Sequence, residues 1–91
     1  MRKDSILSNE YKCFICGRDD IRLDVHHIYR GKNRKVSDEN GFWVYLCNRC
    51  HIQIVHQHPD VDMQLKQACQ TAFEKSQGRD AFRALIQGDF L

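Results

Sequence analysis

Four cysteines form two Cys-x-x-Cys pairs, and histidines lie between and just behind these pairs. The first pair is Cys13 and Cys16, and the second is Cys47 and Cys50. Thiolates at this spacing can bind a tetrahedral metal ion from two tight turns, and soft sulfur ligands favour zinc. Gly17, directly after the first pair, permits the positive φ that such turns often need. The cysteines therefore predict a structural zinc site, with an iron site or a redox-active pair as the alternatives.

The histidines are the second group that could do chemistry. His26 and His27 form a doublet, and His51 and His56 follow the second cysteine pair closely. Because neighbouring strand residues point to opposite faces, His26 and His27 cannot both face one metal ion in a regular strand. The doublet suggests instead that one imidazole binds a cation while the other accepts a proton from water. A pKa near neutrality suits imidazole for that second role.

Size and composition favour one small domain that a metal site would help to stabilise. The chain has 91 residues and a formal net charge of +2, and chains this short bury only a small core. Residues 1–58 hold ten Lys and Arg against seven Asp and Glu, a modest indication of phosphate binding there. No apolar segment has membrane-spanning length, and the N-terminus lacks the apolar stretch of a signal peptide. We therefore expect a cytoplasmic protein with reduced thiols, in which the odd cysteine, Cys69, is a small buried apolar residue.

Two strands should position the first histidines and the second cysteine pair. Alternating apolar residues over 21–28 predict a half-buried strand, and the β-branched and aromatic residues 42–46 predict a second one. Residues 30–41 between them are polar and rich in Gly and Asn, so we expect a loop. That loop carries a basic run that would contact phosphates beside a cation site. The run consists of Arg30, Lys32, Arg34 and Lys35.

Helices are expected in the second half of the chain. A short helix should run from Asn48, as its N-cap, to about His56. Apolar residues at i, i+3, i+4, i+7 and i+8 from Leu65 predict an amphipathic helix that ends near Gly78. A last helix should follow over about residues 80–87. We expect these last two helices to pack over the strands.

Together these residues resemble the HNH endonucleases, the zinc-knuckle branch of the ββα-metal nucleases. The resemblance covers about residues 13–58, and it rests on Val25-His26-His27-Ile28, a polar loop with asparagine, Tyr45-Leu46-Cys47-x-x-Cys50-His51 and His56. Segments such as Gly31-x-Asn33-Arg34-Lys35 are similar to short HNH-type proteins common in bacteriophages and prophages. The resemblance implies an α+β fold with a ββα-metal (HNH) core stapled by a four-cysteine zinc site. Residues 59–91 would form a helical extension of the same single domain.

The resemblance also implies a role for each matching residue. His27 matches the general base, and Asn40 matches the asparagine that orients the base or braces the loop, with Asn33 as a rival. The four paired cysteines match the structural zinc ligands. The ligands of a catalytic divalent cation (Mg²⁺, or Mn²⁺, Ni²⁺ or Zn²⁺) would be His26, His51 and His56.

One spacing departs from the family pattern, which usually places its helix histidines four residues apart. His51 and His56 are five residues apart, which puts them about 140° apart around a helix of ~3.6 residues per turn. For both to reach one ion, the helix must end, bulge or unwind near residues 54–55. His58 is an alternative ligand, on the same helix face as His51.

The implied function is that of a metal-dependent endonuclease that hydrolyses phosphodiester bonds in duplex DNA with low sequence specificity. We expect a monomer in the bacterial cytoplasm, of phage or prophage origin. We expect it to bind DNA, together with phage packaging or recombination proteins, and we expect no membrane partner. The alternative is a non-catalytic zinc-knuckle module that binds nucleic acid or protein. A third hypothesis, thiol–disulfide chemistry, predicts reactive thiols and no tightly bound zinc.

Overall fold

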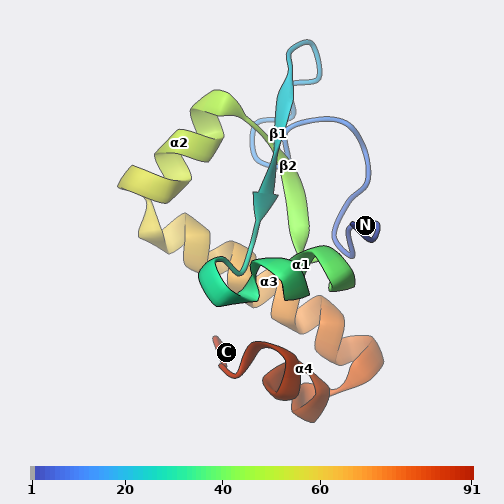
Figure 1. Cartoon of the computed structure of the whole chain (residues 1–91). Coiled ribbons are helices and arrows are strands. Elements are labelled where there is room, and N and C mark those ends of the chain that lie inside the picture. The colour runs from blue at the N-terminus through green and yellow to red at the C-terminus, as the bar shows by residue number, and fades with distance from the viewer. Residues whose placement is uncertain (1) are drawn as a thin grey trace.

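A two-stranded antiparallel sheet with helices around it forms a small α+β domain (Figure 1). The computed structural model describes residues 2–91, apart from the side chains of Val55 and His56. The strands are β1 (Leu23–His27) and β2 (Trp43–Cys47), close to the predicted positions. Within the described chain the helices are the 3₁₀ helix η1 (Gly31–Asn33), α1 (Arg34–Asn40), α2 (Asn48–Gln57), α3 (Pro59–Gln77) and α4 (Arg79–Ile86).

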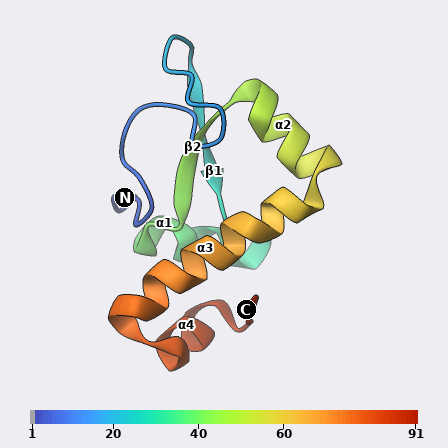
Figure 2. The ribbon, with the colours of Figure 1, turned by 180° about the vertical axis from the view of Figure 1, so that it is seen from behind.

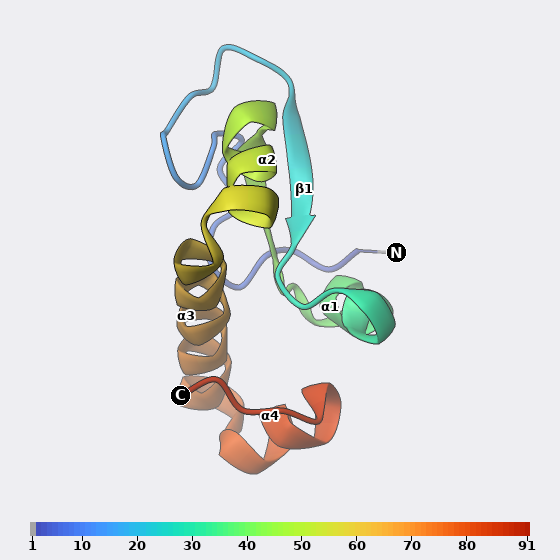
Figure 3. The same ribbon diagram turned by 90° about the vertical axis from the view of Figure 1, so that its left-hand side faces the viewer.

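The two faces of the sheet have different neighbours. His26 lies opposite Val44, and His27 lies opposite Trp43, so the two histidines of the doublet point to opposite faces. Helix α2 runs beside β1 and covers the face of His26 (Figure 3). The N-terminal segment covers the other face, where Trp43 donates a hydrogen bond from its indole nitrogen to the carbonyl of Lys3 at 2.7 Å. The sheet therefore separates the two imidazoles as the strand pattern predicts.

An aromatic core joins the end of the sheet to the C-terminal helices. The ring of Tyr29, just after β1, packs edge-on against Phe42 and Phe82 with centroids 5.4 and 5.5 Å away. Phe73 of α3 contacts Phe42 in the same manner at 5.3 Å. The Tyr29 hydroxyl donates to the carbonyl of Lys66 in α3 at 2.6 Å. Seen from behind, α3 consequently crosses the end of the sheet, with α4 below it (Figure 2).

Both predicted C-terminal helices form. Helix α3 ends where Gly78 adopts a φ of 90°, a conformation that favours glycine. Cys69 is fully buried in α3, as predicted for a small apolar residue. No helix in the described chain is long and apolar enough to cross a membrane.

The prediction of a loop over residues 30–41 is wrong, because most of this segment is helical. Helix α1 packs at the end of the sheet on the side away from α3 (Figures 1 and 3). Its buried side depends on a polar residue: Ser37 is fully buried and donates to the carbonyl of Tyr29 at 2.7 Å. The helix ends at Gly41 with a φ of 76°, where an added Cβ would collide with the carbonyl oxygen of Asp4. The sequence of α1 shows no amphipathic pattern, because its fully buried residue is a serine and not part of an apolar stripe.

The start of α2 also differs from the prediction. Asn48 is the first helical residue rather than the N-cap, and Cys47 occupies the cap position without a side-chain hydrogen bond. Cys47 has extended backbone angles because it ends β2 and turns its thiol toward the other cysteines. The helix continues without a break to Gln57. It therefore does not unwind near residues 54–55, as binding of one ion by both His51 and His56 was expected to require.

Candidate functional site

The four paired cysteines meet in space although thirty residues of chain separate the two pairs. The sulfur atoms of Cys13, Cys16, Cys47 and Cys50 all lie within 4.8 Å of one another. The Cys16 and Cys47 sulfurs are 3.7 Å apart, and a tetrahedral zinc ion with Zn–S bonds of ~2.3 Å requires a separation of about 3.8 Å. Gly17 closes the first turn with a φ of 79°. These cysteines are therefore positioned to hold a metal ion, consistent with the predicted structural zinc.

The surroundings of the thiols favour metal binding. Burial alone would raise the pKa of the Cys13 thiol, but hydrogen bonds from the backbone of Cys16, Cys47 and Ile15 lower that pKa to about 6. Burial and the neighbouring thiols raise the pKa of Cys50. Four thiolates this close to one another would repel unless a cation lay among them. Because thiolates are the form that binds metal, a bound ion would relieve this crowding.

A second cluster surrounds a cavity of about 320 Å³ at the end of β1, which we call the histidine cavity. Residues of β1, of the segment after it and of α2 line this cavity, and five of them are site residues that the sequence predicts. The lining consists of Val25, His26, His27, Arg30, Gly31, Arg34 and His51. The histidine doublet, the first helix histidine and two of the basic residues therefore border one cavity, although the two side chains of the doublet leave β1 on opposite faces.

His26 is the most buried of these residues, with 1% of its surface exposed. Neither of its ring nitrogens has a hydrogen-bond partner within the described part of the chain. Burial, followed by the nearby His51 and Arg30, lowers the pKa of His26 to about 4, so the ring is neutral at pH 7. A buried polar group without a partner costs ~1–3 kcal/mol. A neutral imidazole with a free ring nitrogen is the form of histidine that can bind a cation.

His51 faces His26 from α2, and the two rings meet edge to face with centroids 5.1 Å apart. The Nδ1 atom of His51 lies 3.4 Å from a carboxylate oxygen of Asp24. A carboxylate on one ring nitrogen orients the ring and leaves the other nitrogen for a metal ion. Asp24 is not among the site residues that the sequence predicts, although its place two residues before His26 puts both on one strand face and could have revealed it.

His27 contacts a residue that the resemblance does not name. Its Nε2 atom lies 2.8 Å from Oδ1 of Asp38, in α1. Asn40 instead donates from its amide to the Val36 carbonyl at 2.9 Å within α1, and it lines another cavity, of about 560 Å³. The rival Asn33 donates to a carbonyl in α4 at 3.4 Å. Within the described residues neither asparagine is hydrogen-bonded to His27, whereas the Asn40 bond lies within the segment that the resemblance implies it could brace.

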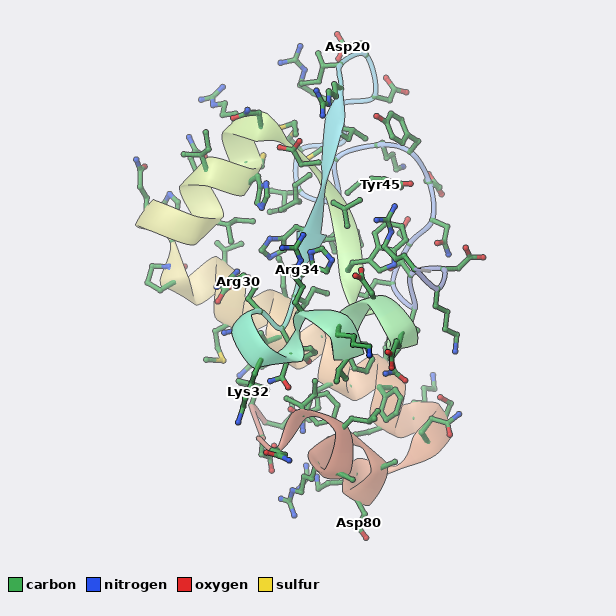
Figure 4. All side chains as sticks on the ribbon, in the orientation of Figure 1. Asp20, Arg30, Lys32, Arg34, Tyr45 and Asp80 are labelled. Carbon is green, nitrogen blue, oxygen red and sulfur yellow. The ribbon has the colours of Figure 1, made fainter. Side chains whose placement is uncertain are left out.

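The four basic residues of the predicted loop divide into two groups. Arg30 and Arg34 lie at the end of β1 and line the histidine cavity, whereas Lys32 points away from the sheet (Figure 4). The Lys35 side chain is 88% exposed and lies 3.9 Å from Glu39 in the next turn of α1. Only the two arginines are thus placed to contact a phosphate bound in the cavity.

Asp62 of α3 links the C-terminal helices to the histidine cavity. Its carboxylate accepts two hydrogen bonds from Arg30, at 3.0 and 3.3 Å, and lies 3.1 Å from the Lys66 ammonium group. It also lies 3.9 Å from Nε2 of His26. Burial alone would raise the pKa of Asp62, but hydrogen bonds from Arg30 and Lys66 lower it. No local pattern could reveal this residue, because it follows Arg30 by 32 positions.

The remaining two histidines do not complete the cavity within the described residues. His56 belongs to α2, but the position of its side chain lies outside the part of the chain that the structure describes. His58, the alternative ligand, follows α2 and lines a different cavity, with Ile15, Cys50 and Ile54 among its neighbours. His58 is therefore separated from the facing pair of His26 and His51.

Comparisons of this chain with protein-family models, curated proteins and solved structures find no match. The chemistry of the cysteine cluster and of the histidine cavity must therefore carry any functional assignment.

Proposed function

We propose that this protein is a metal-dependent endonuclease of the HNH type that hydrolyses phosphodiester bonds in duplex DNA. The observation that carries this proposal is the buried imidazole of His26, which has no hydrogen-bond partner among the described residues and faces His51 across 5.1 Å. His27 and two arginines line the same cavity. A cation ligand, a proton acceptor and phosphate-binding groups are the parts that phosphodiester hydrolysis requires.

The cysteine site would have a structural role in this enzyme. It joins the turn before β1 to the junction of β2 and α2. A zinc ion bound there would hold α2 against the sheet, and this contact sets the separation of His51 from His26. We therefore propose that the zinc positions the catalytic histidines without contacting the DNA phosphate.

The histidine cavity would hold the catalytic cation. His26 and His51 would be two of its ligands, because their rings face one another, and His56 is proposed as a third from the sequence. A divalent ion held there, Mg²⁺ or Mn²⁺, Ni²⁺ or Zn²⁺, would neutralise charge on the scissile phosphate and on the leaving 3′-oxygen.

The protein's own groups would supply the rest of the reaction. His27 takes one proton from a water molecule while the water oxygen bonds to phosphorus and the bond from phosphorus to the 3′-oxygen breaks. The leaving oxygen receives a proton from solvent, and His27 later releases its own to solvent, so the net reaction is hydrolysis. Arg34, from the first turn of α1, and Arg30, held by Asp62, would bind the non-bridging phosphate oxygens.

Plasmid nicking in a series of divalent ions tests the proposal. The wild type should convert supercoiled DNA to nicked or linear forms only when a divalent ion is present. His27→Ala should lower the rate by about 10²–10⁴-fold, as expected for loss of a general base. His58→Ala is the matched control, because this exposed histidine lies outside the histidine cavity, and it should retain full activity.

A non-catalytic binding module is the second candidate, and the unbroken α2 helix favours it. On a continuous helix, His51 and His56 point about 140° apart, which opposes their joint binding of one ion. A wild-type protein that binds DNA and cuts none in any divalent ion would support this candidate and overturn the nuclease proposal.

A further inference from the structure

We propose that Asp38 fixes the tautomer of His27, so that Nδ1 is the nitrogen that accepts the proton from water. The catalytic part of this inference rests on the proposed nuclease function. The tautomer itself does not, and it can be measured in a protein that cuts no DNA. Asp38 would thus be a positioning residue for the base, in place of Asn40.

The contact between the two side chains has the geometry of a hydrogen bond to a charged group. The distance from His27 Nε2 to Asp38 Oδ1 is 2.8 Å, and the side chains are 14% and 36% exposed respectively. An ionised carboxylate can only accept a hydrogen bond, so Nε2 must carry the proton. A neutral imidazole protonated on Nε2 has its lone pair on Nδ1. The contact therefore selects the nitrogen that remains available as a base.

The backbone around Asp38 is held at several points, so its carboxylate is presented from a fixed position. The carbonyl of Asp38 accepts a hydrogen bond from the Lys3 amide at 2.8 Å, and the carbonyl of Ser37 accepts one from the Phe42 amide at 2.9 Å. The Ser37 hydroxyl is tied to the Tyr29 carbonyl. Side chains on such restrained elements hold a catalytic geometry better than side chains on free loops.

A carboxylate does at this position what an amide would not. An asparagine side chain both donates and accepts, so it stabilises either tautomer of the facing imidazole. When His27 takes a proton at Nδ1, its Nε2–H remains donated to Asp38. The positive charge of the resulting imidazolium then forms beside a carboxylate. Both effects favour proton transfer in the wild type, and both are lost in Asp38→Asn.

The tautomer is measured by nitrogen-15 NMR of the histidine rings in the metal-loaded protein at alkaline pH, where imidazole is ordinarily neutral. His27 should be predominantly protonated on Nε2 in the wild type, and Asp38→Asn should shift it toward a mixture of tautomers. Glu39→Gln is the matched control, since it removes the neighbouring carboxylate of α1, which lies 3.9 Å from Lys35, and it should change nothing. Protonation of His27 on Nδ1 in the wild type, or an unchanged tautomer in Asp38→Asn, would overturn the proposal.

Single-turnover nicking supplies the kinetic test. In hydrolases where a carboxylate fixes the tautomer of a catalytic histidine, its amide replacement costs ~10⁴-fold. Because Asp38 is partly exposed, we expect a smaller loss for Asp38→Asn, on the order of 10²-fold. The dissociation constant of the Asp38→Asn variant for DNA should equal that of the wild type. A faster rate in Asp38→Asn would show that Asp38 hinders the base, and an unchanged rate would show that it has no effect on the base. Either result would overturn the catalytic part of the proposal. Absence of cleavage by the wild type would overturn the nuclease proposal. The NMR result alone would then decide the tautomer of His27.

Discussion

Removal of metal from the cysteine cluster should unfold the domain. The cluster joins two distant chain segments: Cys16 and Cys47 are 31 positions apart, and their sulfurs lie 3.7 Å from one another. A hydrogen bond from the Phe14 amide to the Tyr45 carbonyl, at 2.8 Å, also links these segments. One segment is an exposed turn, with Phe14 and Ile15 largely accessible to solvent. These two side chains therefore contribute little apolar burial to the turn, and a metal ion bound by the four cysteines would supply the additional restraint.

The expected magnitude follows from the size of the domain. At ~0.05–0.15 kcal/mol per residue, 91 residues correspond to an unfolding free energy of about 5–14 kcal/mol. A structural zinc ion contributes about 10–16 kcal/mol to the folding of zinc-finger peptides at pH 7. The metal contribution is thus comparable with the whole stability of a domain this small. We expect the metal-free protein to be largely unfolded at 25 °C.

The assay combines elemental analysis with far-UV circular dichroism. The purified wild type should contain one zinc ion per cysteine cluster and show a cooperative thermal transition, which a strong chelator should abolish. Cys47→Ser removes one thiolate from the cluster and should lower both the metal content and the helical signal. Cys69→Ala is the matched control, because Cys69 is fully buried outside the cluster. It should keep its metal and lose only about 1 kcal/mol of stability.

Two results would refute this reasoning. One is a thermal transition that is the same with and without chelator, since the fold would then not depend on a bound ion. The other is a Cys47→Ser variant with the metal content and stability of the wild type. Rapidly reacting thiols in a protein without bound metal would favour thiol–disulfide chemistry instead.

Three further predictions concern the histidine cavity and the core. Asp24→Asn should weaken Mn²⁺ binding in calorimetry by about 10–100-fold, because Asp24 orients His51; equal affinity would contradict this role. Phe82→Ala should lower the urea-unfolding free energy by about 3–5 kcal/mol, since this ring is fully buried in the aromatic core, and a loss under about 1 kcal/mol would be inconsistent with that packing. Gly41→Ala should destabilise the protein more than its control Gly31→Ala does, because both have positive φ but only Gly41 has a backbone carbonyl where the Cβ would lie. The control should lose about 1–2 kcal/mol, and equal losses would argue against the collision.

The sheet and the cysteine cluster could be predicted because their signals are local. Alternation over β1 and a β-rich run over β2 mark the strands, and the Cys-x-x-Cys spacing defines each half of the metal site. The C-terminal helices are likewise marked by an apolar stripe and by Gly78, which ends α3. In each case the residues that form the pattern are the ones that are buried in the core or that lie at a turn.

Helix α1 could not be predicted because tertiary contacts replace the usual sequence signal. Its fully buried residue is Ser37, whose hydroxyl satisfies the carbonyl of Tyr29. A serine in a segment rich in charged residues is typical of loops, so the pattern favours the wrong assignment. The error had a consequence for the site, because Asp38 belongs to this helix. A loop offers no reason to expect a fixed carboxylate near His27.

The resemblance ends near residue 58, but the contacts around the histidine cavity do not. Asp62 holds Arg30 in the cavity and lies 3.9 Å from His26, and the Tyr29 hydroxyl is bonded to the Lys66 carbonyl one turn further along α3. These contacts connect α3 to the segment that directly follows β1. A chain cut after residue 58 would keep all four paired cysteines and lose the carboxylate that orients Arg30. The helical extension is therefore part of the site that we propose, because it determines where one of the two cavity arginines lies.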